Sequence, residues 1–395
     1  MLALVSAAVL LGMSAWFTAS AVSPVLQARW GLTSGQVGWL TTLVQLGFVA
    51  GTAAAALLNL ADIVPSRWYF ALSAVLAALA NAALVIAPGY TIALASRFFT
   101  GFFLAGVYPP AMKMIATWFT SARGMAIGTV VGALAVGKAT PYLLKLVGSA
   151  PLGVVVLGAS TGGVLGGLLV AALYRDGPFP FRRVPFSWAL VARVARDRPT
   201  RLATGGYLGH MWELYAMWTW VPAFLAASAA ARGARIGIAP SAAVVDLVAF
   251  SAIAVGGLGC VWGGYAADRL GRERIVNLAM YVSGTCCLLV GLLFGQSYWL
   301  LVPLVLVWGF FVVADSAQFS AMVTEVAPQE AVGTALTLQT SVGFLLTMVT
   351  IQGVPFLTES VGWPWAFPLL ALGPALGITS IRRMKLGASL RIQPE

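Results

Sequence analysis

Long apolar runs dominate this sequence and limit what it can fold into. Each expected run is about 20 residues long, the length that an α-helix rising 1.5 Å per residue needs to cross the hydrocarbon core of a membrane. Inside that core, backbone polar groups have to be bonded within their own segment, so these runs predict helices. The expected spans are residues 4–25, 37–60, 68–88, 91–117, 124–146, 151–174, 203–229, 243–265, 276–294, 298–322, 333–355 and 362–382.

The composition excludes an ordinary soluble domain. Of the 395 residues, 60% are hydrophobic and only 9% are charged, whereas a soluble domain carries about 25% charged residues. The 43 glycines suit a membrane protein, because small residues let helices pack closely where lipid gives no hydrophobic drive. The sequence therefore predicts an all-α protein of twelve transmembrane helices in contact with the lipid bilayer, and we expect a monomer.

The placement of charge predicts the orientation. A net charge of +11 does not indicate a nucleic-acid partner here, because most Lys and Arg residues fall in alternate loops. This pattern follows the positive-inside rule and puts both termini in the cytoplasm, and we expect a prokaryotic inner (plasma) membrane. The first span has no basic lead, so we interpret it as a membrane helix and not as a signal peptide. The three cysteines lie in apolar runs without metal-ligand spacing, and neither a metal nor another cofactor is expected.

One segment rich in Pro and Arg divides the spans into two sets of six. Residues 1–174 form the expected N-terminal bundle, residues 175–202 the cytoplasmic linker, and residues 203–395 the C-terminal bundle with a short tail. Within the linker, residues 187–196 predict an amphipathic helix on the membrane surface. The halves also share short sequence matches at nearly the same offset. Parallel repeats of this kind are a transporter plan, with the substrate site between the halves.

A compact charged turn between the eighth and ninth spans is the most distinctive motif. It reads Gly264-x-x-x-Asp268-Arg269-x-Gly271-Arg272. Gly271 allows a positive φ, and Asp268 with its neighbouring arginines can form charge-assisted hydrogen bonds that hold two helices together. A weaker copy around Asp62, which lacks the Gly-Arg pair, lies between the second and third spans. A solvated loop that only carries positive charge is the alternative interpretation.

This motif resembles the loop motif of the major facilitator superfamily. Arg97-x-x-x-Gly101 resembles the fourth-span motif of the same superfamily, and the run 108–113 resembles its organic-anion and nitrate-type symporter branches. The resemblance implies two pseudo-symmetric six-helix bundles that rock about a central site, which is called alternating access. It also implies a conformational latch at the loop motifs, here Asp268, Arg269, Gly271, Arg272 and Asp62.

Ionisable side chains inside spans are costly in a membrane and therefore indicate function. Lys138 lies about 21 Å into the fifth span, too deep to reach the interface easily. It is the best candidate for an anion contact, with a buried ion pair as the alternative. Arg97 has two equal interpretations, a substrate or proton contact and an anchor between helices. We predict Lys138, Arg97, Tyr142, Trp220 and Tyr108 as substrate-binding residues.

The seventh span carries the only histidine of the chain. His210 and Glu213 lie on one helical face, and Asp315 is a second buried acid in the tenth span. Burial favours the neutral form of a carboxyl group, and His changes charge near neutral pH. We predict that Glu213, His210 and Asp315 carry the coupling proton, while a structural role for His210 is an equal alternative.

These features predict a secondary active transporter for a small-molecule substrate. The simplest version moves a small organic anion together with protons or another coupling ion, because the buried cations lie in the first half and the buried acids in the second. The many aromatic and Met residues also suit a drug/proton antiporter, and a non-transporting membrane sensor or enzyme is a third possibility. We find no nucleotide-binding glycine loop, metal-ligand spacing or nucleophile with a base, so no enzyme activity is expected.

Overall fold

The computed structural model describes residues 1–119, 123–147, 152–179 and 187–389, without the side chains of residues 61, 62, 123 and 385–389. The regular elements in these ranges are helices. In the first half they are α1 (Leu2–Met13), α2 (Thr18–Ala21), α3 (Ser23–Trp30), α4 (Ser34–Leu57), α5 (Leu60–Ile63), α6 (Ser66–Ala82), α7 (Tyr90–Leu104), α8 (Tyr108–Ala116), α9 (Arg123–Leu144) and α10 (Leu152–Leu173).

The second half begins with the linker helix α11, which forms where the sequence predicts an amphipathic helix. Its helices are α11 (Trp188–Arg196), α12 (Arg198–Ile236), α13 (Ala242–Ala254), α14 (Gly256–Leu270), α15 (Arg272–Leu289), α16 (Tyr298–Ala314), α17 (Ser316–Val326), α18 (Val332–Val361) and α19 (Leu372–Ser389). Short 3-10 turns are η1 (Val290–Leu293), η2 (Gln329–Ala331), η3 (Trp363–Trp365) and η4 (Pro368–Ala371).

Ten segments in the described ranges are long and apolar enough to cross a membrane. Several of them join two helices, such as α7 with α8 and α13 with α14. Two of the expected spans are not among the ten: α6 has 17 residues, and the first span is broken into α1, α2 and α3. The chain is therefore an all-α membrane protein, and the count of long single spans is lower than the sequence predicts.

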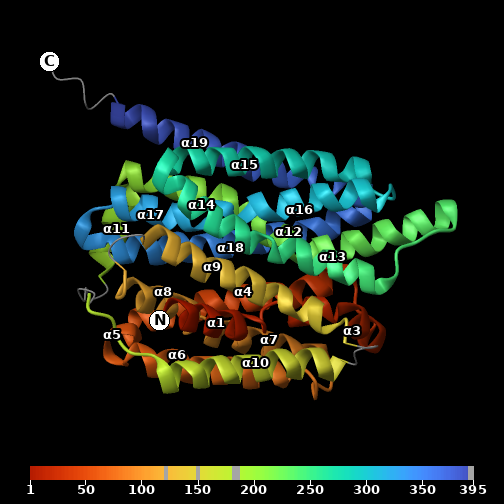
Figure 1. The fold of residues 1–395 in the computed structure, drawn as a ribbon, viewed down its shortest axis with the longest axis horizontal. Coiled ribbons are helices and arrows are strands. Elements are labelled where there is room, and N and C mark those ends of the chain that lie inside the picture. The colour runs from red at the N-terminus through yellow and green to blue at the C-terminus, as the bar shows by residue number, and fades with distance from the viewer. Residues whose placement is uncertain (120–122, 148–151, 180–186, 390–395) are drawn as a thin grey trace.

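The helices form two layers that correspond to the two halves of the sequence (Figure 1). In the first half, α1 packs on α9 and α10, while α4 packs on α7. In the second half, α12 packs on α18 and α19, and α14 packs on α16. The layers meet on two sides, where α9 packs on α13 and α14 and where α4 packs on α18. The interior of the molecule between these two sides is where residues of both halves come together.

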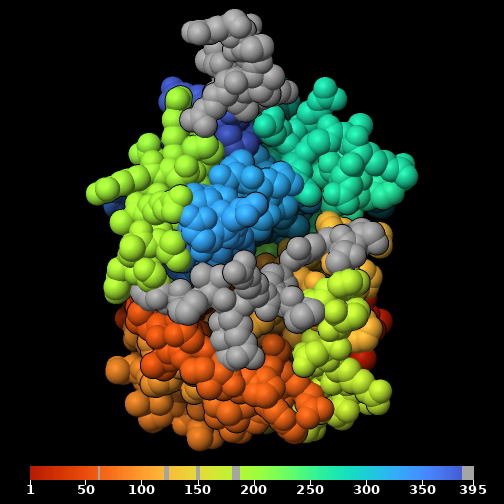
Figure 2. Space-filling model, turned by 90° about the vertical axis from the view of Figure 1, so that its left-hand side faces the viewer, coloured from red at the N-terminus to blue at the C-terminus, as the bar shows by residue number. Residues whose placement is uncertain are grey.

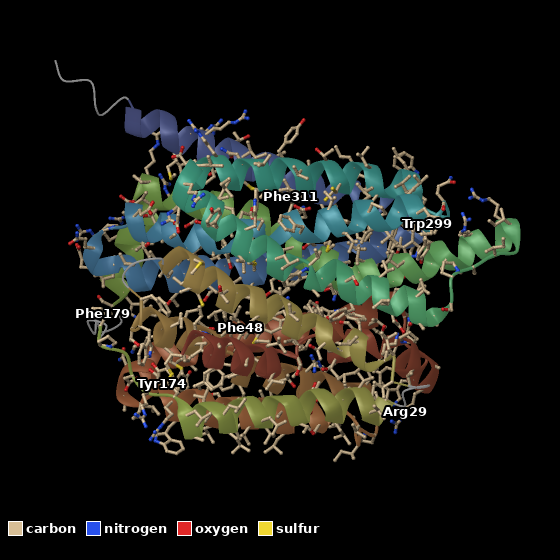
Figure 3. The ribbon with its side chains drawn as sticks, in the orientation of Figure 1. Arg29, Phe48, Tyr174, Phe179, Trp299 and Phe311 are labelled. Carbon is tan, nitrogen blue, oxygen red and sulfur yellow. The ribbon has the colours of Figure 1, made fainter. Side chains whose placement is uncertain are left out.

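The two ends of the molecule differ in what they carry. One end, which we call the α11 end, holds α5, α11 and the turn between α14 and α15, and α19 finishes there (Figure 1). Figure 2 looks onto this end, with teal and blue segments of the second half above orange segments of the first. Tyr174 and Phe179 lie at this end, whereas Arg29 lies at the opposite one, the α3 end (Figure 3).

Local sequence signals set several helix boundaries. Thr33 accepts a hydrogen bond from the backbone of Gln36, whose side chain bonds back to Thr33, so a capping box begins α4. Asp197 caps α12 by accepting from the Thr200 backbone, and Gly237, with φ of +72°, ends it. Gly271, with φ of +92°, separates α14 from α15, as the sequence predicts for this turn.

Helix breaks interrupt the first and fourth spans. Residues 14–17 separate α1 from α2, and residues 105–107 separate α7 from α8. The expected continuous span 4–25 is therefore wrong in detail, because the helical path runs to Trp30 with two interruptions. Broken helices are tolerated in a membrane where other groups bond the freed backbone. The break at residues 14–17 carries the aromatic side chains of Trp16 and Phe17 into the interior.

Glycines near the middle of α9 allow the two halves to touch closely. A Cβ added to Gly132 of α9 would lie 2.7 Å from the carbonyl oxygen of Gly257 in α14, and one added to Gly257 would lie 3.0 Å from that of Gly132. Larger residues at these positions would force the helices apart. The close approach brings α9 against the second half, which places Lys138 beside it.

Candidate substrate and coupling sites

Lys138 lies in the interior where the two halves meet. It belongs to α9, is 1% exposed, and donates a hydrogen bond to the hydroxyl group of Tyr215 in α12. Its Nζ atom lies 3.8 Å from the ring centre of Trp16 and 4.4 Å from that of Tyr215. Aromatic faces attract a cation. Within the described ranges no carboxylate forms an ion pair with Lys138, so the alternative of a buried ion pair has no support there.

Six aromatic side chains form a connected cluster at this lysine, which we call the aromatic cage. Ring centres of neighbouring members lie between 4.6 Å and 6.4 Å apart, the range in which tilted and edge contacts are favourable. Half of the members come from each half of the chain, and Phe48 lies near the middle of the molecule (Figure 3). The members are Trp16, Phe17, Phe48, Tyr215, Trp218 and Phe344.

Two ring nitrogens of the aromatic cage are unbonded donors. Nε1 of Trp16 and Nε1 of Trp218 are buried and have no hydrogen-bond partner among the described residues. The hydroxyl group of Tyr142, one helical turn beyond Lys138 on α9, is buried and unpartnered in the same sense. Buried polar groups normally have partners. A cluster of donors and one ammonium group is therefore chemically suited to an anion.

Arg97 anchors the broken first span. Its side chain is fully buried in α7 and donates to the carbonyl oxygens of Ala15 (3.0 Å) and Trp16 (2.5 Å). It also donates to Oδ1 of Asn81 in α6 at 2.6 Å. These contacts support the helix-anchor interpretation of Arg97. They also fix the backbone that carries Trp16, so Arg97 acts on the aromatic cage through Trp16, and a direct substrate contact stays a prediction.

The other two predicted substrate residues have different surroundings. Trp220 donates from Nε1 to the carbonyl oxygen of Ile351 in α18 at 2.8 Å, and its ring lies against Gly38 of α4. It therefore ties α12 to α18 where α18 meets α4. Tyr108 begins α8 directly after the break in the fourth span and packs at the edge of the main core. No contact brings either side chain to Lys138 in the described part, so their roles stay predictions.

Glu213 occupies a separate, fully bonded position in the second half. It is 1% exposed. Its Oε1 accepts from Nε1 of Trp308 at 2.6 Å and from Sγ of Cys287 at 3.1 Å, while Oε2 accepts from Oγ of Ser283 at 2.8 Å. These donors come from α15 and α16 and all are uncharged. The carboxyl group is thus held in place without a cation.

His210 contacts Asp315, which lies about a hundred residues later in the sequence. Its Nδ1 atom lies 2.9 Å from Oδ1 of Asp315, and both side chains are buried. The ring of Phe319 lies 5.3 Å from that of His210. Nε2 of His210 has no hydrogen-bond partner within the described ranges. The predicted proton residues therefore fall into two groups, a His210–Asp315 pair and a separately bonded Glu213.

Sequence reasoning missed the contacts that join the halves towards the α3 end. Lys145, just past the end of α9, pairs with Asp246 of α13 at 2.6 Å. Gln352 of α18 donates to Oγ1 of Thr42 in α4 at 2.9 Å. The sequence placed Lys145 and Asp246 at span ends, and only their three-dimensional pairing shows that they bridge the halves.

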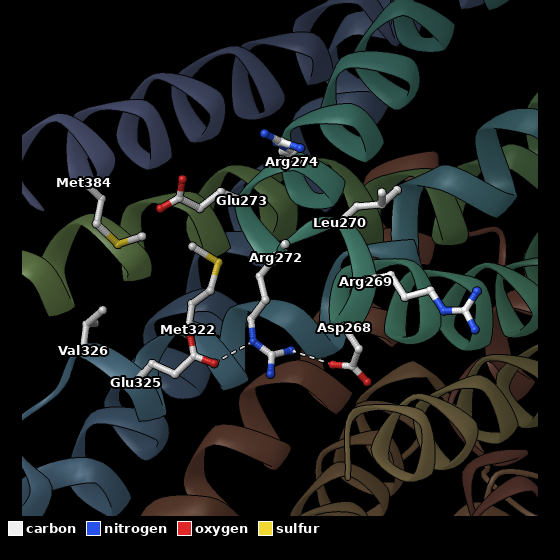
Figure 4. A pocket seen from close by; sticks show the side chains of 11 residues that line it. Asp268, Arg269, Leu270, Arg272, Glu273, Arg274, Met322, Glu325, Val326 and Met384 are labelled. Carbon is white, nitrogen blue, oxygen red and sulfur yellow. Dashed lines mark hydrogen bonds and ion pairs between the residues drawn. The ribbon is translucent and has the colours of Figure 1, made fainter. Parts of the chain in front are cut away.

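The charged turn forms a network at the α11 end. Arg272 donates to Oε1 of Glu325 and to Oε1 of Gln318, both at 2.7 Å, and lies 3.7 Å from Asp268 (Figure 4). An open pocket is lined by this turn together with α17. The place of this pocket at one end of the molecule fits a latch better than a central substrate site.

Asp268 reaches from this network to the other half. Its carboxylate lies beside Gly124 at the start of α9, where an added Cβ would meet Oδ1 at 2.9 Å. A helix N-terminus favours a negative charge. Arg269 instead lies over the ring of Tyr265, 4.1 Å from its centre. The side chain of Asp62, the predicted counterpart, lies outside the described residues.

Comparisons with known proteins agree with this architecture. The family described as the Major Facilitator Superfamily matches residues 4–350. A protein named "Shikimate transporter" from Escherichia coli (strain K12) is 30% identical over 151 residues, which cover 33% of this chain and 33% of that protein. The matched part thus spans about a third of the length of this relative. The family match extends over nearly the whole chain, and the chain belongs to the Major Facilitator Superfamily of transporters.

Proposed function

We propose that this protein is a secondary active transporter that moves a small organic anion with proton coupling. The observation that carries this proposal is the ammonium group of Lys138, buried between the halves with aromatic faces and unbonded N–H donors around it. A buried charge without an opposite charge is costly, and an anionic substrate would supply that charge. The match to a protein named as a shikimate transporter supports an organic acid as the substrate.

The transport cycle follows from the two-layer arrangement. In our proposal residues 1–174 and 203–395 are two six-helix bundles joined by the linker 175–202, with α6 and the broken first span completing twelve spans. The bundles rock about the Lys138 site so that it opens to each side in turn. We place both termini in the cytoplasm of a prokaryotic cell, following the positive-inside rule.

Proton coupling in this proposal uses the acids of the second half. Glu213 has only neutral partners, so gaining a proton breaks no ion pair. Asp315 has His210 beside it, and a proton can be shared between the two. Neither acid touches Lys138 in the described contacts. Protonation would therefore act on the packing of α12 against α15 and α16 instead of on the substrate directly.

The charged turn is proposed as the latch. Arg272 holds α14, α15 and α17 together, and Asp268 crosses to the start of α9. Separating the bundles at the α11 end would break the Asp268 contact while leaving the Arg272 network within the second half. We therefore assign the latching contact to Asp268 and the support of that contact to Arg269, Gly271 and Arg272.

The test is transport by the purified protein in liposomes. An imposed inward proton gradient should drive uptake of an organic acid found by a ligand-stability screen, in which binding raises the melting temperature. Lys138→Ala should lose that uptake. Normal affinity in the variant would contradict the proposal. Drug export driven by the opposite gradient, without dependence on Lys138, would favour the drug/proton antiporter. The aromatic cage would also suit the apolar drug site of such an antiporter.

A further inference from the structure

The interior cations of the first half are not equivalent, and only one is placed to bind a substrate. Arg97 already donates to two backbone carbonyls and to Asn81. Lys145 is paired with Asp246. Lys113 has an interaction of its own. Among the described residues, Lys138 is the one buried ammonium group that contacts the aromatic cage. The proposed substrate site therefore offers a single positive charge from this part of the chain.

Resting on the proposed anion transport, we propose that this site selects monocarboxylates with a ring-shaped apolar body, namely cyclic or aromatic monocarboxylic acids. The proposal joins two observations, the single charge at Lys138 and the six rings of the aromatic cage. It excludes dicarboxylates, inorganic anions and short-chain acids as preferred substrates.

Charge and donor count argue for one carboxylate. Besides Lys138, the aromatic cage supplies the N–H groups of Trp16 and Trp218, which lack partners among the described residues. A carboxylate has two oxygens that accept several hydrogen bonds, so one ammonium group and two N–H groups match one carboxylate. A second carboxylate would lose its hydration on entering the interior and would find no second cation there, which is unfavourable.

The aromatic cage argues for an apolar ring. Besides these few donors, its members present mainly hydrocarbon faces, tilted to one another by 38° to 60° in most pairs. Flat rings pack well in offset or edge contacts with such faces. A small hydrophilic anion would lose its water here with only a few donors in return. A ring offsets that loss, since burying its apolar area is favourable.

The supply of rings from both halves adds to this argument. Trp16, Phe17 and Phe48 belong to the first half, while Tyr215, Trp218 and Phe344 belong to the second. A ring-bearing substrate held among them would contact both bundles at once. A small anion without a ring would lack these ring contacts with both bundles. Substrates that bridge the bundles are the ones whose binding can bias the rocking movement.

The experiment measures binding to the full chain in lipid nanodiscs by calorimetry, using matched probes. Benzoate and cyclohexanecarboxylate carry a ring and one carboxylate. Benzamide keeps the ring without charge, acetate keeps the charge without a ring, and terephthalate adds a second carboxylate. Nitrate and benzyltrimethylammonium test inorganic anions and organic cations. We expect the two ring monocarboxylates to bind best, and each other probe to bind at least about 10-fold more weakly, which is about 1.4 kcal/mol.

Variants connect this selectivity to the site. Lys138→Gln should weaken benzoate binding about 100-fold and leave benzamide nearly unchanged, because only the charge-assisted contact is lost. Trp16→Phe keeps a ring and removes one N–H donor, and should weaken benzoate binding about 5-fold. Lys145→Gln is the matched control, since this lysine follows the same helix but is paired with Asp246, and should leave benzoate affinity within about 2-fold.

The outcomes separate the two proposals. Terephthalate, acetate or nitrate binding as tightly as benzoate, with loss in Lys138→Gln, would overturn the ring monocarboxylate class and leave organic-anion transport intact. Benzyltrimethylammonium binding while no anion binds would overturn both. Benzoate binding that Lys138→Gln leaves unchanged would overturn the site. If Lys138→Gln fails to fold, the probe series on the unmodified chain and Trp16→Phe still decide the class.

Discussion

Lys138 and Glu213 are both buried at 1% exposure, neither forms an ion pair within the described residues, and their surroundings differ. Glu213 has fixed neutral donors on both oxygens, from Trp308, Cys287 and Ser283. Lys138 has one hydroxyl partner and otherwise ring faces. A hydrogen bond to a charged group contributes about 1.5–3 kcal/mol, more than most single cation–π contacts at about 0.5–2 kcal/mol.

The difference supports our proposal that Lys138 binds the substrate and Glu213 carries the proton. Both oxygens of Glu213 already accept hydrogen bonds, so a ligand that bound there would have to break existing hydrogen bonds. Lys138 is held by weaker contacts that a carboxylate can replace. In our proposal the substrate therefore binds between the two layers and the proton within the second, and α12, which carries both Tyr215 and Glu213, connects the two positions.

The largest expected effect is a difference in substrate affinity between variants at these two positions. Lys138→Gln should lower the affinity for the organic acid about 100-fold, whereas Glu213→Gln should change it less than about 3-fold, because in our proposal Lys138 contacts the substrate and Glu213 does not. Calorimetry on both variants measures this difference. Equal losses would show that the two groups act as one site.

The second prediction concerns accumulation of the substrate, for which Glu213 is expected to matter more than it does for binding. Glu213→Gln keeps the shape of the side chain but cannot take up a proton, so substrate exchange across the membrane should persist while proton-driven uphill uptake is lost. Counterflow and gradient-driven uptake in liposomes measure these separately. Asp315→Asn is the parallel variant: loss of coupling there, with Glu213→Gln still coupled, would move the proton site to the His210 pair.

A smaller effect is expected at Arg97. Arg97→Lys loses donors to the carbonyls of Ala15 and Trp16, and each unbonded buried carbonyl costs about 1–3 kcal/mol. Substrate affinity should fall about 10-fold as Trp16 shifts, with a lowered melting temperature. Ser96→Ala is the matched control, since it removes a bond from the same helix to Ala80 and leaves the first span untouched. A loss of affinity in both variants would make Arg97 a general packing residue.

The smallest effect is expected at the latch, far from both interior sites. Asp268→Asn weakens the contact with the start of α9, worth about 0.3–1 kcal/mol, and should shift the inward/outward balance by a few-fold at most. It should shift it more than Asp62→Asn, whose motif is degraded. Cysteine accessibility labelling at the two ends measures the balance. Equal shifts would contradict the asymmetry between the two turns.

The sequence predicted elements that depend on local pattern. Apolar runs predicted the helical segments, the Gly271 turn was recognised from its neighbours, and α11 forms within the predicted linker. The depth of Lys138 followed from counting residues along one helix. These features need no knowledge of which helix lies beside which.

What the sequence could not show depends on distant pairing. The aromatic cage joins residues up to about 330 positions apart, such as Trp16 and Phe344. The break at residues 14–17 contains no proline, and it is stabilised by Arg97 from another span. His210 was grouped with Glu213 because they share a helix face, yet tertiary packing gave it Asp315.

The contact between Gly132 and Gly257 has a mechanical consequence for alternating access. Gly132 lies nine residues from the start of α9 and twelve from its end, which is about 14 Å and 18 Å along the axis. If this backbone contact serves as the pivot, a rotation of about 10° moves both helix ends by about 2–3 Å in opposite directions. Opening the gap between the bundles at one end would then narrow the gap at the other end by a similar amount. The position of two glycines would thus set how far the bundle ends move in each cycle.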